Sequence, residues 1–200
     1  MTEKRIEVGG MSDRERLLSR YATCGGEIAY DVAQIHATTF GAIEAMARGA
    51  DARAIVNLIE RVATWWKNLA TDANNLSQFL ASGERMAPAT EKLEVAWGAT
   101  REEWGTTREE LESGARSQMG ASLNNAPAEV EAILRLIRQA MISEIEDPGA
   151  DFGHKNWIAR RTAELTRVAE EQWAYFKSAA RRLAPFAEEE EQQEDASARE

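Results

Sequence analysis

Residues that could bind a metal ion are few in this sequence and poorly spaced for the task. The chain has two histidines and one cysteine. Helical bundles that hold two irons use four carboxylates and two Glu-x-x-His motifs, and the nearest pattern here is Asp151-x-x-His154, beside a turn. The other histidine, His36, follows the apolar Ile35, and we expect it to be a partly buried packing residue. The sequence therefore predicts no metal site and no cofactor.

Covalent catalysis has no better support. Cys24 lies near the apolar side of the first predicted helix, where a thiol usually acts as a small hydrophobic group. The chain contains no Gly-x-Ser-x-Gly element, and its glycines lack the strand and Lys-Ser/Thr context of a phosphate-binding loop. We therefore expect a protein that is not an enzyme. A subunit of an enzyme whose site is buried among helices is the less favoured alternative.

The charge distribution argues against nucleic acid as a partner. The formal net charge is −10, of which residues 187–200 contribute −6 through seven acids and one arginine, so the remainder carries −4. Nucleic acids bind basic surfaces, and we interpret the basic residues near the end of the chain, which acidic residues interrupt, as a solvated face. These residues are Lys155, Arg160, Arg161, Arg167, Lys177, Arg181 and Arg182. A further hypothesis is that the acidic tail folds back onto these arginines.

Cysteine usage and the N-terminal residues bear on the compartment. A single cysteine excludes an internal disulfide and fits a reducing environment. The first residues, MTEKRIEVGG, lack the apolar core of a signal peptide, and no run of about 20 apolar residues could span a bilayer. We expect a cytoplasmic protein without a transmembrane segment.

The central element is the stretch Asp51 to Ser82, whose apolar residues recur at alternating intervals of four and three. These residues are Ile55, Ile59, Val62, Trp66, Leu69, Ala73, Leu76 and Leu80. Such spacing is typical of a helix that packs against other helices. Asp51 is placed to cap the start of this helix and Gly83 to end it.

Aromatic and aliphatic residues beside this pattern are candidates for contact with an apolar surface or a protein partner. The candidates are Leu58, Trp65, Trp66, Phe79, Trp97 and Trp104. Neighbouring residues on a helix point about 100° apart, so Trp65 and Trp66 cannot both face one narrow stripe. Burial in a helical core is the simpler interpretation for both of them.

Further helices are predicted on either side of the central one. The first begins at the Ser-x-x-Glu capping box at Ser12 and ends near Arg48. Inside it, Gly25-Gly26 indicates a kink, a close approach of another helix, or simple tolerance. A third helix starts near Pro88 and contains a duplication, WGATREE at 97–103 and WGTTREE at 104–110, which places Trp97, Trp104 and Leu111 on one stripe.

The second half of the chain predicts two more helices and a tail. Asn124, Asn125 and Pro127 indicate a break before a helix over 128–146, and the turn 146–149 precedes a last helix from about Lys155 to Leu183, which Pro185 ends. The predicted fold is therefore all-α, an antiparallel bundle of about five helices, several of them long and coiled-coil-like. Residues 1–11 are expected to be a flexible arm, 12–186 a single domain, and 187–200 a disordered acidic tail.

The region from Tyr21 to Ser82 resembles phasins, the helical proteins that coat polyhydroxyalkanoate granules in bacteria. The resemblance lies in a long alanine-containing helix, the short break RGAD, and an aspartate-led helix with regularly spaced aliphatic and aromatic residues. It covers about a third of the chain. The Trp-Gly-x-Thr-Arg-Glu-Glu repeat, the tryptophan content and the second half depart from the family. The resemblance implies a non-enzymatic protein whose amphipathic helices cover a hydrophobic granule surface.

Two other kinds of contact protein remain open. One is a helical adaptor or chaperone that presents a groove to a specific protein partner. The other is a self-assembling homo-oligomer, for which the heptad patterns at 55–80 and 93–111 are the evidence.

Overall fold

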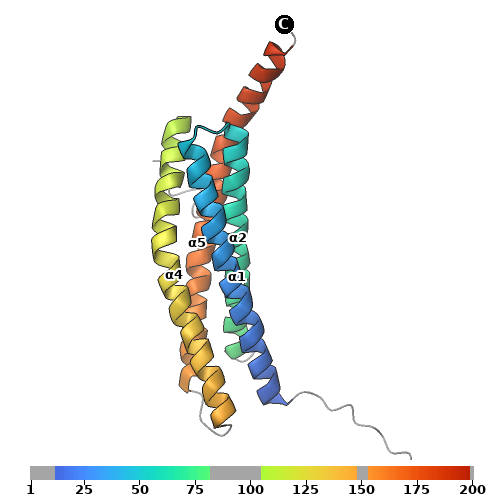
Figure 1. The fold of residues 1–200 in the computed structure, drawn as a ribbon, viewed down its shortest axis with the longest axis vertical. Coiled ribbons are helices and arrows are strands. Elements are labelled where there is room, and N and C mark those ends of the chain that lie inside the picture. The colour runs from blue at the N-terminus through green and yellow to red at the C-terminus, as the bar shows by residue number, and fades with distance from the viewer. Residues whose placement is uncertain (1–11, 82–104, 148–152, 199–200) are drawn as a thin grey trace, which may run out of the picture.

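A computed structural model of the protein describes residues 12–81, 105–147 and 153–198, and these residues are helical, as the sequence predicts. Within these ranges the structure contains no strand. The helices are α1 (Asp13–Ala47), α2 (Ala52–Leu80), α4 (Arg108–Glu146) and α5 (Gly153–Ser197) (Figure 1).

The four helices lie side by side. Contacts join α1 to α2, α2 to α5, α5 to α4 and α4 to α1. Figure 1 shows that α1 and α5 run in one direction and α2 and α4 in the other, so that each contacting pair is antiparallel. The apolar side chains of all four helices meet in one buried cluster.

The central stripe predicted on α2 supplies much of this cluster. All eight of its residues are buried, and Trp66 is only 1% exposed. The matching stripe on α1 buries Tyr21, Ile28 and Ile35 against it. A helix with one apolar stripe buries that stripe against its neighbours, and burial of a large apolar side chain stabilises the fold by about 1.5–3 kcal/mol.

Helix starts follow local capping chemistry. Ser12 and Glu15 form the predicted capping box at the start of α1, and the Asp51 side chain accepts a hydrogen bond from the Ala54 N–H at the start of α2. Between these helices Gly49 adopts a φ of +71°, a region that favours glycine because it has no Cβ. Both predicted helix starts are confirmed.

The predicted boundaries of α4 are wrong. The helix is continuous through Asn124, Asn125 and Pro127, where a break was expected. Met119 and Val130 are buried on either side of this region, so packing holds both halves on one axis, and tertiary contacts commonly override local propensity in this way. The helix begins at Arg108, after the capping box that Thr107 and Glu110 form, and so joins parts of two predicted helices. The expected start of the third helix near Pro88 lies outside the described residues.

The acidic tail is also not as predicted. Residues 187–197 continue α5, which contains Pro185 rather than ending there, and Figure 1 shows this last stretch leaning away beyond the other helices. Alanine, glutamate and glutamine have high helix propensity. Leu183 is buried and Phe186 packs against the core, so contacts on both sides of the proline hold the helix together.

Of the explanations for Gly25-Gly26, close approach fits Gly25 and tolerance fits Gly26. A Cβ added to Gly25 would lie 3.6 Å from a methyl group of Ile137, in α4, whereas Gly26 has nothing within 4 Å. No helix in the described part of the chain has the length and apolar character needed to cross a membrane. The expected arm 1–11 lies outside the described residues.

A candidate apolar contact surface on α1 and α2

The outward face of α1 is almost free of charge. Its exposed residues between Ser19 and Ile43 are Ser19, Ala22, Thr23, Gly26, Glu27, Ala29, Tyr30, Ala33, Ala37 and Phe40. Only Glu27 among them is charged. Tyr30 is 57% and Phe40 66% exposed, although both are large hydrophobic side chains. By contrast, the exposed residues of α2 include Arg53, Glu60 and Lys67.

These residues follow a second helical repeat, opposite the buried one. Intervals of three and four residues connect Thr23, Gly26, Tyr30, Ala33, Ala37, Phe40, Glu44 and Ala47. We call this set the outer stripe of α1. Its centre consists of two alanines, and an aromatic residue lies on each side of them. A helix with an apolar face on each side is normally covered on both sides.

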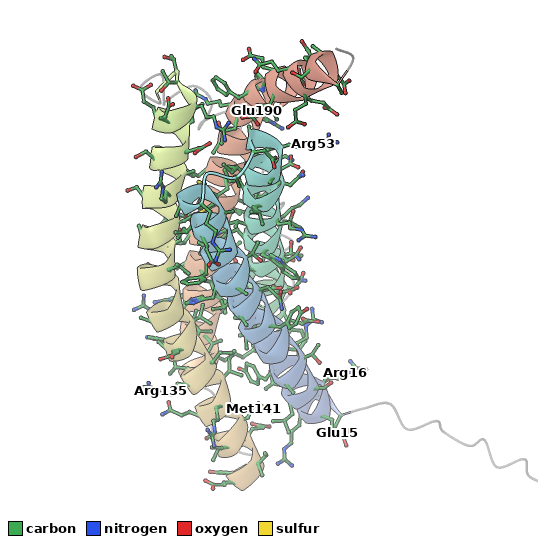
Figure 2. The ribbon with its side chains drawn as sticks, turned by 45° about the horizontal axis from the view of Figure 1, so that its top comes forward. Glu15, Arg16, Arg53, Arg135, Met141 and Glu190 are labelled. Carbon is green, nitrogen blue, oxygen red and sulfur yellow. The ribbon has the colours of Figure 1, made fainter. Side chains whose placement is uncertain are left out.

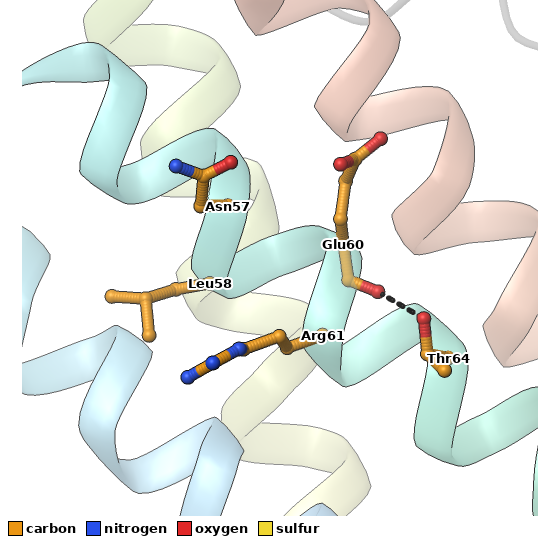
Figure 3. A pocket seen from close by; sticks show the side chains of 5 residues that line it. All are labelled: Asn57, Leu58, Glu60, Arg61 and Thr64. Carbon is orange, nitrogen blue, oxygen red and sulfur yellow. Dashed lines mark hydrogen bonds between the residues drawn. The ribbon is translucent and has the colours of Figure 1, made fainter.

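Side chains of α2 extend this apolar face. The Tyr30 ring packs edge-on against Trp65, with ring centroids 5.7 Å apart and planes at 77°. Leu58 is half-buried, and Figure 3 shows it pointing from α2 toward α1. Phe79 is 40% exposed and lies under the Arg20 guanidinium, 5.7 Å from its ring centre.

The candidate contact residues predicted from the sequence therefore separate into three groups. Leu58, Trp65 and Phe79 lie along the border between α1 and α2, where Leu58 and Trp65 are half-buried and Phe79 is 40% exposed. Trp66 belongs to the core, because it occupies the central stripe of α2. Trp97 and Trp104 lie outside the described residues.

The sequence analysis missed Tyr30 and Phe40. Their signal was present, because residues 28–43 contain no charged residue except Asp31, and Asp31 is buried. A helix exposed to water on one side usually carries charges on that side. The absence of charge outside the first apolar stripe could have revealed a second apolar face.

A shallow depression of about 560 Å³ borders this surface on α2 and is lined by Asn57, Leu58, Glu60, Arg61 and Thr64 (Figure 3). The Thr64 hydroxyl donates to the Glu60 carbonyl at 2.8 Å, and the Glu60 carboxylate pairs with Lys177 of α5 at 3.2 Å. All the lining residues come from one helix. The Glu60–Lys177 pair joins α2 to α5, whereas the Thr64 bond stays within α2, and the lining brings no nucleophile and base together.

The buried carboxyl group of Asp31 lies beside that of Asp72, between α1 and α2. Asp31 is only 4% exposed. Burial raises its pKa to about 7, and a hydrogen bond with Asp72 and the nearby charge of Glu27 act in the same direction. A group with such a pKa can exchange a proton near neutral pH, but a substrate would have to enter the core to reach it. We therefore assign Asp31 to the helix interface.

A second polar cluster joins α1 to the end of α4. The Arg14 guanidinium donates to the Glu144 carbonyl at 2.8 Å and pairs with its carboxylate at 3.6 Å. Tyr21 is buried nearby, and burial, followed by the charge of Glu144, raises its pKa to about 12. A high pKa keeps this phenol neutral, so it is unsuited to act as a base near pH 7.

Residues with metal-binding or nucleophilic side chains remain apart. No group of three or more His, Cys, Asp or Glu side chains converges on a metal position in the described ranges. His36 is half-buried, and Cys24 is buried, which raises the pKa of its thiol. Asp151 lies outside the described residues, and the His154 side chain is not described.

The basic residues of α5 and its acidic end have separate partners. Arg161 pairs with Glu164 at 2.8 Å, and Arg167 pairs with Glu171. The acidic end contacts other helices: Figure 2 shows Glu190 and Arg53 at the same end of the molecule, where Arg53 pairs with Glu191 at 2.8 Å. Because α5 continues as a helix, its acidic end cannot fold back onto its own arginines, so that hypothesis is wrong.

Arg108 holds this end together. Its guanidinium pairs with Glu112 and Glu190 and donates to the Ala50 carbonyl at 2.8 Å. Glu190 also accepts from the Ala52 N–H at 2.6 Å, a donor without a partner inside its own helix. The turn between α1 and α2, the start of α4 and the end of α5 are therefore tied at one point.

Comparison with known proteins adds no family. The sequence matches no protein-family model, no curated protein and no solved structure at a significant level.

Proposed function

We propose that this protein is a non-enzymatic contact protein, and that it binds apolar material through the outer stripe of α1 and the neighbouring side chains of α2. The observation that carries the proposal is the uncharged outward face of α1, with Tyr30 and Phe40 more than half exposed. Contiguous exposed apolar patches on soluble domains commonly mark interaction sites.

Covering this surface contributes favourably to the free energy of binding. Complete burial of a large apolar side chain contributes about 1.5–3 kcal/mol, and Tyr30 and Phe40 each have more than half of that area still exposed. Together they offer about 2–4 kcal/mol, and the alanines between them add further area. The core does not have to open for this binding, because the surface is accessible in the folded state.

A hydrophobic polymer surface, such as the polyester of polyhydroxyalkanoate granules, suits this face better than an anionic membrane. Helices that bind anionic lipid carry Lys and Arg on the polar side of the apolar face. Along α1 the described residues between Arg20 and Arg48 include no Lys or Arg. The resemblance to phasins over residues 21–82 supports the same choice of surface.

The test is sedimentation with polyester particles. The purified protein should pellet with the particles and remain in solution in buffer alone. Tyr30→Ser/Phe40→Ser should release most of the bound protein. Ile145→Ser is the matched control, because Ile145 is also a large exposed apolar residue, 60% exposed, but lies on α4. Equal sedimentation with and without particles would reject the proposal, as would equal binding by the double variant.

An adaptor that binds a helix of another protein is the second candidate function. It is favoured by the small residues Gly26, Ala33 and Ala37 in the outer stripe, which allow another helix to approach closely. Isolation of a one-to-one complex that Phe40→Ser abolishes, together with no binding to particles, would select this function over the first.

A further inference from the structure

We propose that the outer stripe of α1 binds a second copy of this chain, with the two α1 helices antiparallel and paired about residue 35. This inference rests on the proposed function, because it names the partner that covers the same face in solution. In this orientation the outer stripe of one copy can pack against the outer stripe of the other. The reason is the order of its small and aromatic residues along the helix, which is symmetric about residue 35.

The register is fixed by the positions of small and aromatic residues. In an antiparallel pair centred at residue 35, Ala33 lies opposite Ala37 of the second copy and Tyr30 lies opposite Phe40 of the second copy. Each pairing occurs twice because the two copies are related by a two-fold axis. The four alanines allow the helix axes to approach to about 8 Å. The aromatic rings then cover the space on both sides of the alanines.

The charged residues at the ends of the stripe do not oppose this arrangement. Glu44 lies opposite Gly26 of the second copy, where there is no side chain to repel it. Arg48 already pairs with Glu44 one turn away in its own helix. Glu27 is exposed beside the stripe. It follows Gly26, so in the dimer it lies within one turn of the Glu44–Arg48 pair of the second copy. The acidic end of α5 lies beyond the far end of α1 (Figure 1).

The area predicts a weak dimer. Within α1 the pairing runs from Thr23 to Ala47, which is about 38 Å long at 1.5 Å per residue, and a strip about 10–12 Å wide covers roughly 400 Å² on each copy. The total of about 800 Å² lies below the roughly 1,000 Å² of stable specific interfaces and in the range of weak, transient ones. We therefore expect a dissociation constant in the micromolar range, with Trp65 adding contact area beside Tyr30.

Sedimentation velocity over about 2 to 200 µM tests the dimer. The unaltered chain should shift from monomer to dimer across this range, and Ala33→Glu should remain monomeric because it places two carboxylates in the centre of the interface. Ala163→Glu makes the same substitution at an exposed position of α5 and should leave the dimer intact. Circular dichroism should show equal helix content in all three proteins, because both alanines are exposed.

Cysteine cross-linking tests the direction of pairing. A disulfide requires Cα atoms within about 7 Å. A mixture of the Ala33→Cys and Ala37→Cys proteins should therefore cross-link faster than either protein alone. The unaltered chain is the control, because its own Cys24 is buried. Faster cross-linking of each single variant with itself would indicate parallel helices and overturn the proposal.

A monomer at every concentration overturns the dimer, and so does a dimer that Ala33→Glu leaves unchanged. These outcomes are separable from failure of the proposed function. A chain that stays monomeric but binds polyester particles removes the dimer and keeps the function. A chain that dimerises but never binds particles keeps the dimer and removes the function.

Discussion

The buried Asp31 makes the stability of the α1–α2 interface depend on pH. Its carboxyl group is 4% exposed and faces Asp72 of α2, with Glu27 of α1 nearby. Burial, the hydrogen bond with Asp72 and the two neighbouring carboxylates raise the pKa of Asp31 from its ordinary 3.8 to about 7. Between these two values the folded state keeps a proton on Asp31 that the unfolded state has lost. The free energy of unfolding therefore falls as pH rises from about 4 to about 7.

The size of the effect follows from the same values. A difference of one pH unit in pKa corresponds to about 1.4 kcal/mol, so ionised Asp31 costs the folded state on the order of 4 kcal/mol. Between pH 5 and pH 8 the loss is roughly 3 kcal/mol, because the part between pH 4 and pH 5 has already occurred. Asp31→Asn keeps the shape of the side chain and stays neutral, so this part of the pH dependence should disappear.

Urea unfolding at pH 5 and pH 8, followed by circular dichroism, measures the effect. The unaltered chain should lose roughly 3 kcal/mol more between these pH values than Asp31→Asn loses. Glu131→Gln, which removes an exposed carboxylate from α4, should behave like the unaltered chain. The reasoning is refuted if the Asp31→Asn protein and the unaltered chain lose stability in parallel.

Three further substitutions test the description of the fold. Glu190→Ala should lower the free energy of unfolding by about 1–2 kcal/mol, because it removes the partner of Arg108 and of the Ala52 N–H, whereas Glu189→Ala, at an exposed neighbouring position, should change it little in the same urea titration. Gly120→Ala should raise the thermal unfolding midpoint, since a Cβ there meets nothing within 4 Å and alanine is favoured over glycine in a helix by about 1 kcal/mol; an unchanged or lower midpoint would contradict this. Gly105→Ala should lower the midpoint, because its Cβ would collide with the Glu110 side chain of the capping box. The fall in the midpoint should match the fall caused by Glu110→Ala.

Local signals in the sequence predict those parts of this fold that local interactions determine. The caps at Ser12 and Asp51 were predictable because each side chain bonds to a backbone N–H within three residues. The buried stripe of α2 was predictable because its repeat persists through the whole helix. Both features depend on residues close together in the chain.

The errors arise where distant contacts decide the outcome. Pro127 and Pro185 each suggested a helix end, but residues on both sides of each proline are packed against other helices. The acidic end of α5 was expected to be disordered from its composition, yet Glu190 and Glu191 have arginine partners on α4 and α2. No pattern within 187–200 indicates those arginines, which lie more than 80 positions away.

Only one part of the candidate surface, too, could be predicted from local patterns in the sequence. The apolar border at Leu58, Trp65 and Phe79 was predictable from α2 alone, because these residues flank its buried stripe. The outer stripe of α1 required knowing which side of α1 faces the core. Once Ile28 and Ile35 are known to be buried, Tyr30 and Phe40 must face away from the core.

A helix that is apolar on two opposite sides needs two partners. Inside the molecule, α2 and α4 cover one side of α1, and Gly25 lets α4 approach closely there. On the other side, contacts within the described part of the chain leave Tyr30 57% and Phe40 66% exposed. Charged side chains on that face would favour its contact with water. They would cost little in folding, because exposed positions tolerate them. Their absence between residues 28 and 43, over about four turns, is the observation on which the proposed apolar partner rests.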